Sequence, residues 1–155
     1  MNMGMRKAAL NAYGKQDLAA QVEAASPHRL IVMLFDGAIK ACNLAKMHMR
    51  NGAIADKGMA ITKAIAIVQE GLRLSLDKEA GGELAANLDA LYDYMGRMLL
   101  QANLHNDEAK LDEVAELLAG LRESWVQIDP AKAAAAEPEP SAPPSRAVPS
   151  SYGRA

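Results

Sequence analysis

Three histidines and a single cysteine are the side chains of this sequence that most often bind metal ions in proteins. His28, His48 and His105 each follow an alanine, not a glutamate, by three residues. A carboxylate-bridged metal pair in a helical bundle needs Glu-x-x-His on two helices and a glutamate on each of the others. The spacing argues against such a centre. We expect surface or helix-end histidines, with no metal and no other cofactor.

Two aspartates stand in similar apolar contexts, Asp36 in Leu-Phe-Asp-Gly and Asp93 in Leu-Tyr-Asp-Tyr. Facing carboxylates could perform acid–base chemistry in a cleft. No loops that could form a cleft surround them, so we expect each to face solvent or to pair with Lys40, Arg97 or an arginine of another helix. Because a phosphate-binding glycine loop and a nucleophile elbow are also missing, we predict that the protein is not an enzyme.

Composition narrows the remaining classes. The chain has 155 residues, of which 50% are hydrophobic, 23% charged and 4% aromatic, with a net charge of -2. This balance offers no basic field for nucleic acid, and no apolar run reaches the ~18 residues of a membrane span. The sole cysteine, Cys42, forms no internal disulfide, and we expect it in the core. We predict a cytosolic protein without membrane insertion.

Helix-start and helix-stop signals divide the chain. Ser26-Pro27 predicts the start of a first helix, and Asn51-Gly52 predicts its end. Asp56 is expected to cap a second helix, followed by a connection over residues 77–82. Asp107 is expected to cap the last helix, which ends at Asp129-Pro130.

These three helices and a further one over residues 84–104, with short connections between them, favour an all-α, antiparallel, up-and-down four-helix bundle over residues 26–129. Residues 1–25 form a lead segment whose structure the sequence leaves open. Residues 130–155 are rich in Pro and Ala, bury little apolar surface, and are predicted to be a disordered tail.

The stretch 84–104 is more apolar than a two-layer packing requires. A helical stripe of Leu84, Leu88, Leu91, Met95, Leu99 and Ala102 is expected to face the core. Tyr92, Tyr94, Met98, Leu100 and Leu104 are left over. The two tyrosines differ by roughly 200° around a helix, so at least one must face a partner, the lead segment or a helix boundary.

Two other helical patterns bear on partners and core. Beside the second helix's core stripe runs a row of mostly small side chains, Ala60, Ala64, Ile67 and Gly71, which would let another helix come close. The last helix carries a heptad-like core seam of Leu111, Val114, Leu118, Leu121, Trp125 and Ile128. Unbranched methionine side chains can mould to varied apolar partners, and five were considered for this role: Met33, Met47, Met59, Met95 and Met98.

These residues resemble the FliS family of flagellin export chaperones from about Leu10 to Ile128. The strongest blocks are Leu-Tyr-Asp-Tyr-Met at 91–95 and Gln-Ala-Asn at 101–103. Ala-Ser-Pro at 25–27 and Trp125 also match the family. The other matching segments are residues 33–38, 63–67, 72–77 and 81–88. Phe35 departs from the family's common tyrosine, and the tail is longer and richer in proline.

The resemblance implies a cytosolic bundle that binds the disordered C-terminal segment of flagellin, prevents its early polymerisation, and brings it to the flagellar export gate. It also implies that the lead segment, with Tyr13 matching the family's N-terminal tyrosine, can fold over the binding groove. The alternative is a helical adaptor for a different, folded partner. The residues predicted to bind the partner are Leu10, Tyr13, Ile61, Ala64, Ile67, Tyr92, Tyr94, Met98 and Asn103.

Overall fold

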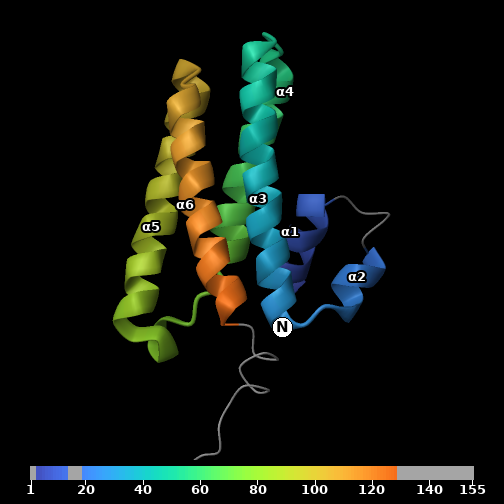
Figure 1. Ribbon diagram of the computed structural model, residues 1–155, viewed down its shortest axis with the longest axis vertical. Helices are drawn as coiled ribbons and strands as arrows, with labels where there is room; N and C mark the ends of the chain where they lie inside the picture. The colour runs from blue at the N-terminus through green and yellow to red at the C-terminus, as the bar shows by residue number, and fades with distance from the viewer. Residues whose placement is uncertain (1–2, 14–18, 129–155) are drawn as a thin grey trace, which may run out of the picture.

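The structure, a computed structural model, describes residues 3–13 and 19–128, and of residues 3, 10–13 and 19–20 it describes the backbone alone. It contains helices α1 (Met3–Tyr13), α2 (Ala19–Ala24), α3 (Pro27–Arg50), α4 (Ile54–Ala66), η1 (Ile67–Leu72), α5 (Lys78–His105) and α6 (Glu108–Gln127). Helices α3, α4, α5 and α6 alternate in direction and pack in a ring, which confirms the predicted bundle (Figure 1).

Local capping explains where α3 and α6 begin. The Ser26 hydroxyl accepts a hydrogen bond from Arg29 N and is followed by Pro27. The Asp107 carboxylate likewise accepts from Ala109 N at the start of α6. Helix α4 differs, because it begins at Ile54 with no side-chain cap, directly after the turn at Gly52 (φ 71°). The predicted cap at Asp56 is therefore wrong, and Asp56 instead lies in the first turn.

The connection predicted over residues 77–82 is only partly a connection. Asp77 caps a helical turn by accepting a hydrogen bond from Ala80 N, and the helix is broken at Gly82, where φ is 54° and ψ is -131°. Only a residue without a side chain adopts such a backbone at low cost. Leu84 follows this kink and is 67% exposed, so the core stripe predicted for this helix begins later than expected.

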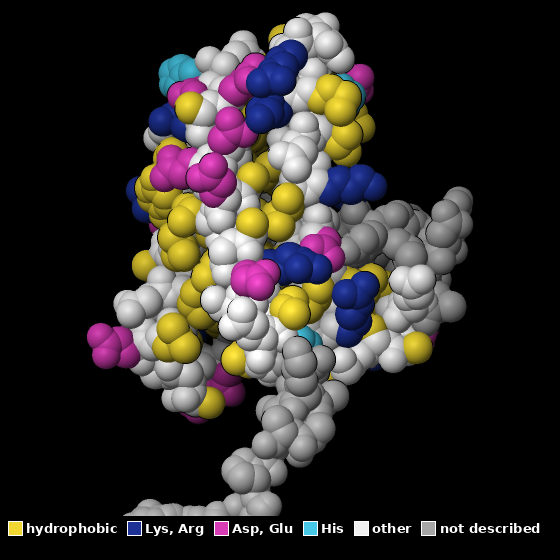
Figure 2. All heavy atoms as spheres, in the orientation of Figure 1, with side chains coloured by type: hydrophobic (Ala, Val, Ile, Leu, Met, Phe, Trp, Pro, Cys, Tyr) yellow, Lys and Arg dark blue, Asp and Glu magenta, His cyan; other side chains and the backbone are white. Residues whose placement is uncertain are grey.

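Helix α3 is the central element, since it packs against α1, α4, η1 and α6. Its buried face includes Leu30, Leu34, Ala38, Cys42 and Ala45. Polar contacts join it to α6 along one seam, where Asp36 pairs with Arg122, Lys46 Nζ lies 2.7 Å from Asp112, and Arg50 Nε lies 3.0 Å from Glu108. Basic and acidic side chains lie next to each other on this face (Figure 2).

The predicted seam of α6 is buried at Leu111, Val114 and Leu118. Leu121 and Trp125 are only half-buried, and Ile128 is exposed, so the prediction of a fully buried seam is wrong at this end. The reason is geometric. Ile128 comes directly after Gln127, the last residue of α6, so it lies beyond the helix whose face carries the seam.

The described parts of the lead segment, α1 and α2, are helical, and α1 belongs to the packed structure. Met5, Ala8 and Ala9 of α1 are buried against the core, and Arg6 Nη1 donates a 2.7 Å hydrogen bond to the Val22 carbonyl of α2. Gly71 of η1 makes this contact possible, because a Cβ there would lie 3.1 Å from the Ala8 Cβ and 3.1 Å from a Leu34 methyl group.

Helix α4 continues directly into η1, which is a π-helical turn. The Arg73 N–H donates to the Val68 carbonyl, five residues back, at 2.8 Å. A π turn holds one more residue than an α turn, so everything after it is rotated back by about 100° relative to an uninterrupted α-helix. The turn therefore decides which side chains of residues 70–74 share a face with α4.

Candidate partner-binding groove

The residues considered for metal or acid–base chemistry have other roles in the structure. Among the described residues, no three His, Cys, Asp or Glu side chains gather in a way that could hold a metal ion. Asp36 pairs with Arg122, and Asp93 pairs with Arg97 at 3.2 Å and Arg73 at 3.4 Å, which confirms the predicted pairing with cations. Cys42 is a core residue as predicted, and burial raises the pKa of its thiol to about 12.

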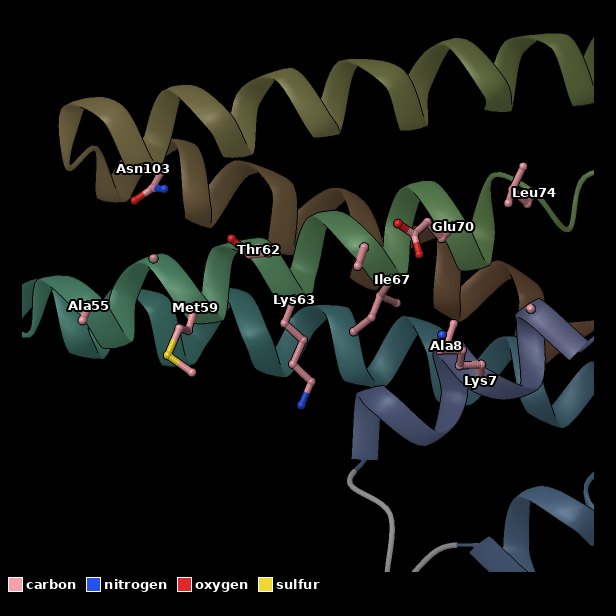
Figure 3. A pocket seen from close by; sticks show the side chains of 13 residues that line it. Lys7, Ala8, Ala55, Met59, Thr62, Lys63, Ile67, Glu70, Leu74 and Asn103 are labelled. Atoms are coloured by element: carbon pink, nitrogen blue, oxygen red, sulfur yellow. The ribbon is translucent and has the colours of Figure 1, made fainter.

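An open groove of about 930 Å³ runs along the outer face of α4 and η1 (Figure 3). Its floor is made largely of small side chains of α4, namely Ala55, Gly58, Thr62 and Ala66. Met59 and Leu74 are the large apolar residues that flank it, and they are 70% and 68% exposed. A strip of small residues bordered by exposed apolar side chains suits a helix packed at close range.

The π turn is what makes this strip straight. Leu74 follows Ala55 by 19 residues, which would place it about 100° around an uninterrupted α-helix. The extra residue of η1 removes that rotation and brings Leu74 back into line with Ala55 and Ala66. Glu70 and Ile67, which lie within the π segment, also line the groove.

Helix α1 closes one end of the groove through Gly4, Lys7 and Ala8. Lys63 and Met59 extend along one side, whereas Glu70 and Asn103 lie on the other (Figure 3). The two sides therefore differ in charge, with cations on one and a carboxylate on the other.

The backbone of Asn103 is held in place by a lysine of α4, Lys57. Lys57 is only 4% exposed, and its Nζ donates to the Asn103 carbonyl at 3.0 Å and to the Asn106 side chain at 2.7 Å. Carbonyls at a helix C-terminus are negative and lack intrahelical partners, so a buried ammonium stabilises them there. Lys57 thus fixes the end of α5 against α4 beside the groove.

Eight of the nine residues predicted to bind a partner fall into three groups. Ile67 and Asn103 line the groove, although Ile67 is only 1% exposed and belongs mainly to the core. Ile61, Ala64, Tyr92 and Met98 are buried in the core, and burial raises the pKa of Tyr92 to about 12. Leu10 and Tyr13 belong to α1 by their backbone, and their side chains lie outside the described residues.

Tyr94, the remaining residue of that set, lies at the α5–α6 boundary. Its hydroxyl donates a 2.6 Å hydrogen bond to Glu113, which raises the pKa of the phenol. The prediction that at least one of the two tyrosines lies off the core is confirmed at this helix boundary. Whether Tyr94 also contacts a partner stays a prediction.

Several groove residues were not in the predicted set. Lys7, Ala55, Gly58, Thr62, Lys63 and Leu74 line the groove. Met59 was considered among five methionines, of which Met33, Met95 and Met98 prove to be buried. The signal that could have found the others is the spacing of three or four residues between the small residues Ala55, Gly58, Thr62 and Ala66, next to Met59.

The fold and the groove define a helical bundle with an open surface groove. In the part of the chain that the structure describes, no helix is long and apolar enough to cross a membrane. The family described as "Flagellar protein FliS" matches residues 9–132. The chain therefore belongs to the FliS family.

The chain is similar in sequence to known members of this family over most of their length. The chain is 49% identical to the flagellar secretion chaperone FliS of Salmonella typhimurium over 121 residues, which are 78% of this chain and 90% of that protein. It is 45% identical to FliSB of Pseudomonas aeruginosa over 117 residues, covering 76% and 92%. It is 38% identical to FliS of Bacillus subtilis over 106 residues, covering 68% and 77%. This membership supports a role as an export chaperone.

Proposed function

We propose that the protein is a cytosolic export chaperone that binds the disordered C-terminal segment of flagellin, prevents its premature polymerisation, and delivers it to the flagellar export gate. The observation that carries the proposal is the straight groove on α4 and η1, with its floor of small residues and its exposed Met59 and Leu74. An amphipathic helix binds such a groove through apolar side chains at i, i+3, i+4 and i+7.

The lead segment is part of the same proposal. Helix α1 borders the groove, so its position controls the space available to flagellin at that end. A segment that must move before a ligand binds raises the apparent dissociation constant by the inverse of the open fraction.

A calorimetric titration of the full chain with a peptide of the flagellin C-terminal segment tests the proposal. Folding of the peptide on binding typically buries on the order of 1,000–3,000 Å², so we expect a negative heat-capacity change and added helix by circular dichroism. A peptide of equal length from the flagellin N-terminal region serves as the control. Equal binding of both peptides, or of neither, would favour the adaptor alternative.

A pair of variants tests where the peptide binds. Ala66→Trp fills the groove floor, whereas Ala119→Trp places the same side chain on the exposed face of α6. We expect the first variant to weaken binding by at least about tenfold, because an indole would displace the ligand backbone. The second should bind as the unmodified chain does.

A further inference from the structure

Segment η1 lies between α1 and α5 and contacts both (Figure 3). Gly71 is buried on the α1 side, where a Cβ would lie 3.1 Å from the Ala8 Cβ and 3.1 Å from a Leu34 methyl group. Gln69 and Arg73 each lie two residues from Gly71, so they point to roughly the opposite side of the helix, toward α5. Helix α1 can lie this close to η1 only while a residue without a side chain faces it.

The π turn determines that Gly71 is the residue that faces α1. An uninterrupted α-helix would place the end of η1 about 100° further round, so Glu70 would take the direction that Gly71 now has. Glu70 is exposed in the structure. If it faced α1, its side chain would overlap the methyl groups of Ala8 and Leu34, and its carboxylate would lose contact with water. Docking of α1 therefore depends on the π register of η1.

Side chains on the α5 side hold both ends of the π turn. Gln69 Nε2 donates to the Tyr92 carbonyl at 2.7 Å, and Gln69 Oε1 accepts from Arg73 Nη1 at 2.7 Å. Arg73 also donates from Nε and Nη2 to the two carboxylate oxygens of Asp89, at 2.7 and 3.2 Å. Helix α5 leaves room for this arrangement, because a Cβ at Gly96 would lie 2.7 Å from Gln69 Nε2. We call Gln69, Arg73 and Asp89 the Arg73 network.

The Arg73 network spans the same residues as the π hydrogen bond. Gln69 directly follows Val68, whose carbonyl accepts that bond from the Arg73 N–H at 2.8 Å. A π turn is rare, so it needs contacts that stabilise it over a continuous α-helix. A change to the α register would turn Arg73 about 100° around the helix and carry its guanidinium away from Asp89. The paired bonds to Asp89 have a specific geometry and therefore favour the π register.

We infer that the Arg73 network positions α1, because it holds η1 in the register that presents Gly71 to that helix. Within the described residues, none of the hydrogen bonds of the network goes to α1. The inference goes beyond the proposed function, since it concerns how α1 is held and requires no ligand. A change on α5 is then expected to loosen α1 on the far side of η1.

Gly96→Ala tests this coupling from α5. Its methyl group would displace the Gln69 amide, while alanine itself favours the helix. Hydrogen–deuterium exchange of the full chain is measured by mass spectrometry for residues 4–9 of α1 and residues 30–45 of α3. A short helix loses its protection once it leaves the bundle, so we expect exchange in α1 to rise about tenfold while exchange in α3 stays unchanged. Gly120→Ala on α6 is the matched control, because a Cβ there meets nothing within 4 Å.

Arg73→Gln tests the central residue of the network. It removes the paired hydrogen bonds to Asp89, so we expect the same selective rise in α1 exchange. Arg97→Gln is the control, since Arg97 pairs with Asp93 of its own helix and has no printed-length bond to η1. The inference is overturned if Gly96→Ala and Arg73→Gln both leave α1 exchange unchanged relative to α3. It is also overturned if the α1 amides of the unmodified chain are unprotected.

Deletion of Glu70 separates the register from the contacts. The Arg73 N–H would then follow the Val68 carbonyl by four residues, so an ordinary α turn would keep Gly71 facing α1. We expect Arg73→Gln to loosen α1 in the full-length chain and to have little effect in the shortened chain. An equal effect in both folded chains would show that Arg73 does not act through the register, and would overturn the inference. If the shortened chain does not fold, the comparison of Gly96→Ala with Gly120→Ala decides.

Discussion

His28 and Trp125 hold each other through both their rings and their backbones. Their ring centroids lie 5.0 Å apart at an interplanar angle of 11°. The Trp125 indole N–H donates to the His28 carbonyl at 3.0 Å, and His28 Nε2 lies 2.8 Å from the Trp125 carbonyl. This reciprocal contact joins the first turn of α3 to the last turn of α6.

Trp125→Ala should lower the free energy of unfolding by about 2–3 kcal/mol, because a half-buried tryptophan loses less than the 3–5 kcal/mol of a fully buried one. His28→Phe keeps the stacked ring but loses one hydrogen bond, so about 1 kcal/mol is expected. Urea unfolding followed by circular dichroism measures both. An unchanged midpoint for Trp125→Ala would contradict a stabilising role for the contact.

Gly58→Ala should stabilise the protein and weaken peptide binding. A Cβ at Gly58 meets nothing within 4 Å, so the substitution gains the helix propensity of alanine, about 0.5–1 kcal/mol, while it narrows the groove floor. Gly120→Ala in α6 is a matched control, because its Cβ also meets nothing and it lies outside the groove. Equal peptide affinities for the two variants would show that Gly58 is not a point of close approach.

Arg73→Gln should reduce the acid sensitivity of the fold. Hydrogen bonds from Arg73 lower the pKa of Asp89 from its ordinary 3.8, against an opposing effect of partial burial. Because the folded-state pKa is below the unfolded one, this contribution is present above about pH 4 and is lost as the pH falls through the folded value. Urea midpoints at a series of pH values should therefore fall less steeply in acid for the variant.

The control for this measurement is Arg97→Gln. Arg97 pairs with Asp93 in a more exposed position and does not contact Asp89. Its removal should leave the acid dependence close to that of the unmodified chain. If both variants behave alike, the acid sensitivity does not come from Asp89.

Alkaline solution should destabilise the core through Cys42 and Tyr92. Burial raises the pKa of each group to about 12, from 9.0 for the thiol and 10.0 for the phenol. Their contribution is complete below the unfolded-state pKa and is lost as the pH rises toward the folded value. Cys42→Ala and Tyr92→Phe should each flatten the fall in urea midpoint above about pH 9. If neither substitution changes the fall in urea midpoint, groups other than Cys42 and Tyr92 cause that fall.

The sequence predicted best those features that depend on neighbouring residues. Ser26-Pro27, Asn51-Gly52 and Asp107 mark helix ends in the structure as they do in the sequence, because a cap satisfies backbone groups within three residues. The bundle itself followed from helical periodicity. The prediction at Asp56 was wrong because the helix starts three residues earlier, with Ala53 at its N-cap, directly after the Gly52 turn and without a side-chain cap.

The groove was harder to predict because it depends on how the helices pack. Ile61 and Ala64 were placed at the binding surface, yet they face the core, whereas their neighbours Thr62 and Lys63 line the groove. A prediction off by one residue moves a side chain about 100° around a helix. The π turn rotates the residues that follow η1 by the same angle, and no residue type in 67–72 predicts such a turn.

The π turn also determines what kind of helix can follow the groove. Two regular helices with a heptad repeat stay in contact only by winding around each other to the left, whereas an eleven-residue repeat winds slightly to the right. The strip from Ala55 to Leu74 winds in neither direction. The one extra residue of the π turn cancels the rotation of the strip around the helix axis over a length of about 30 Å. A ligand helix can therefore lie straight along it, and its contact residues need not keep the spacing of a coiled coil.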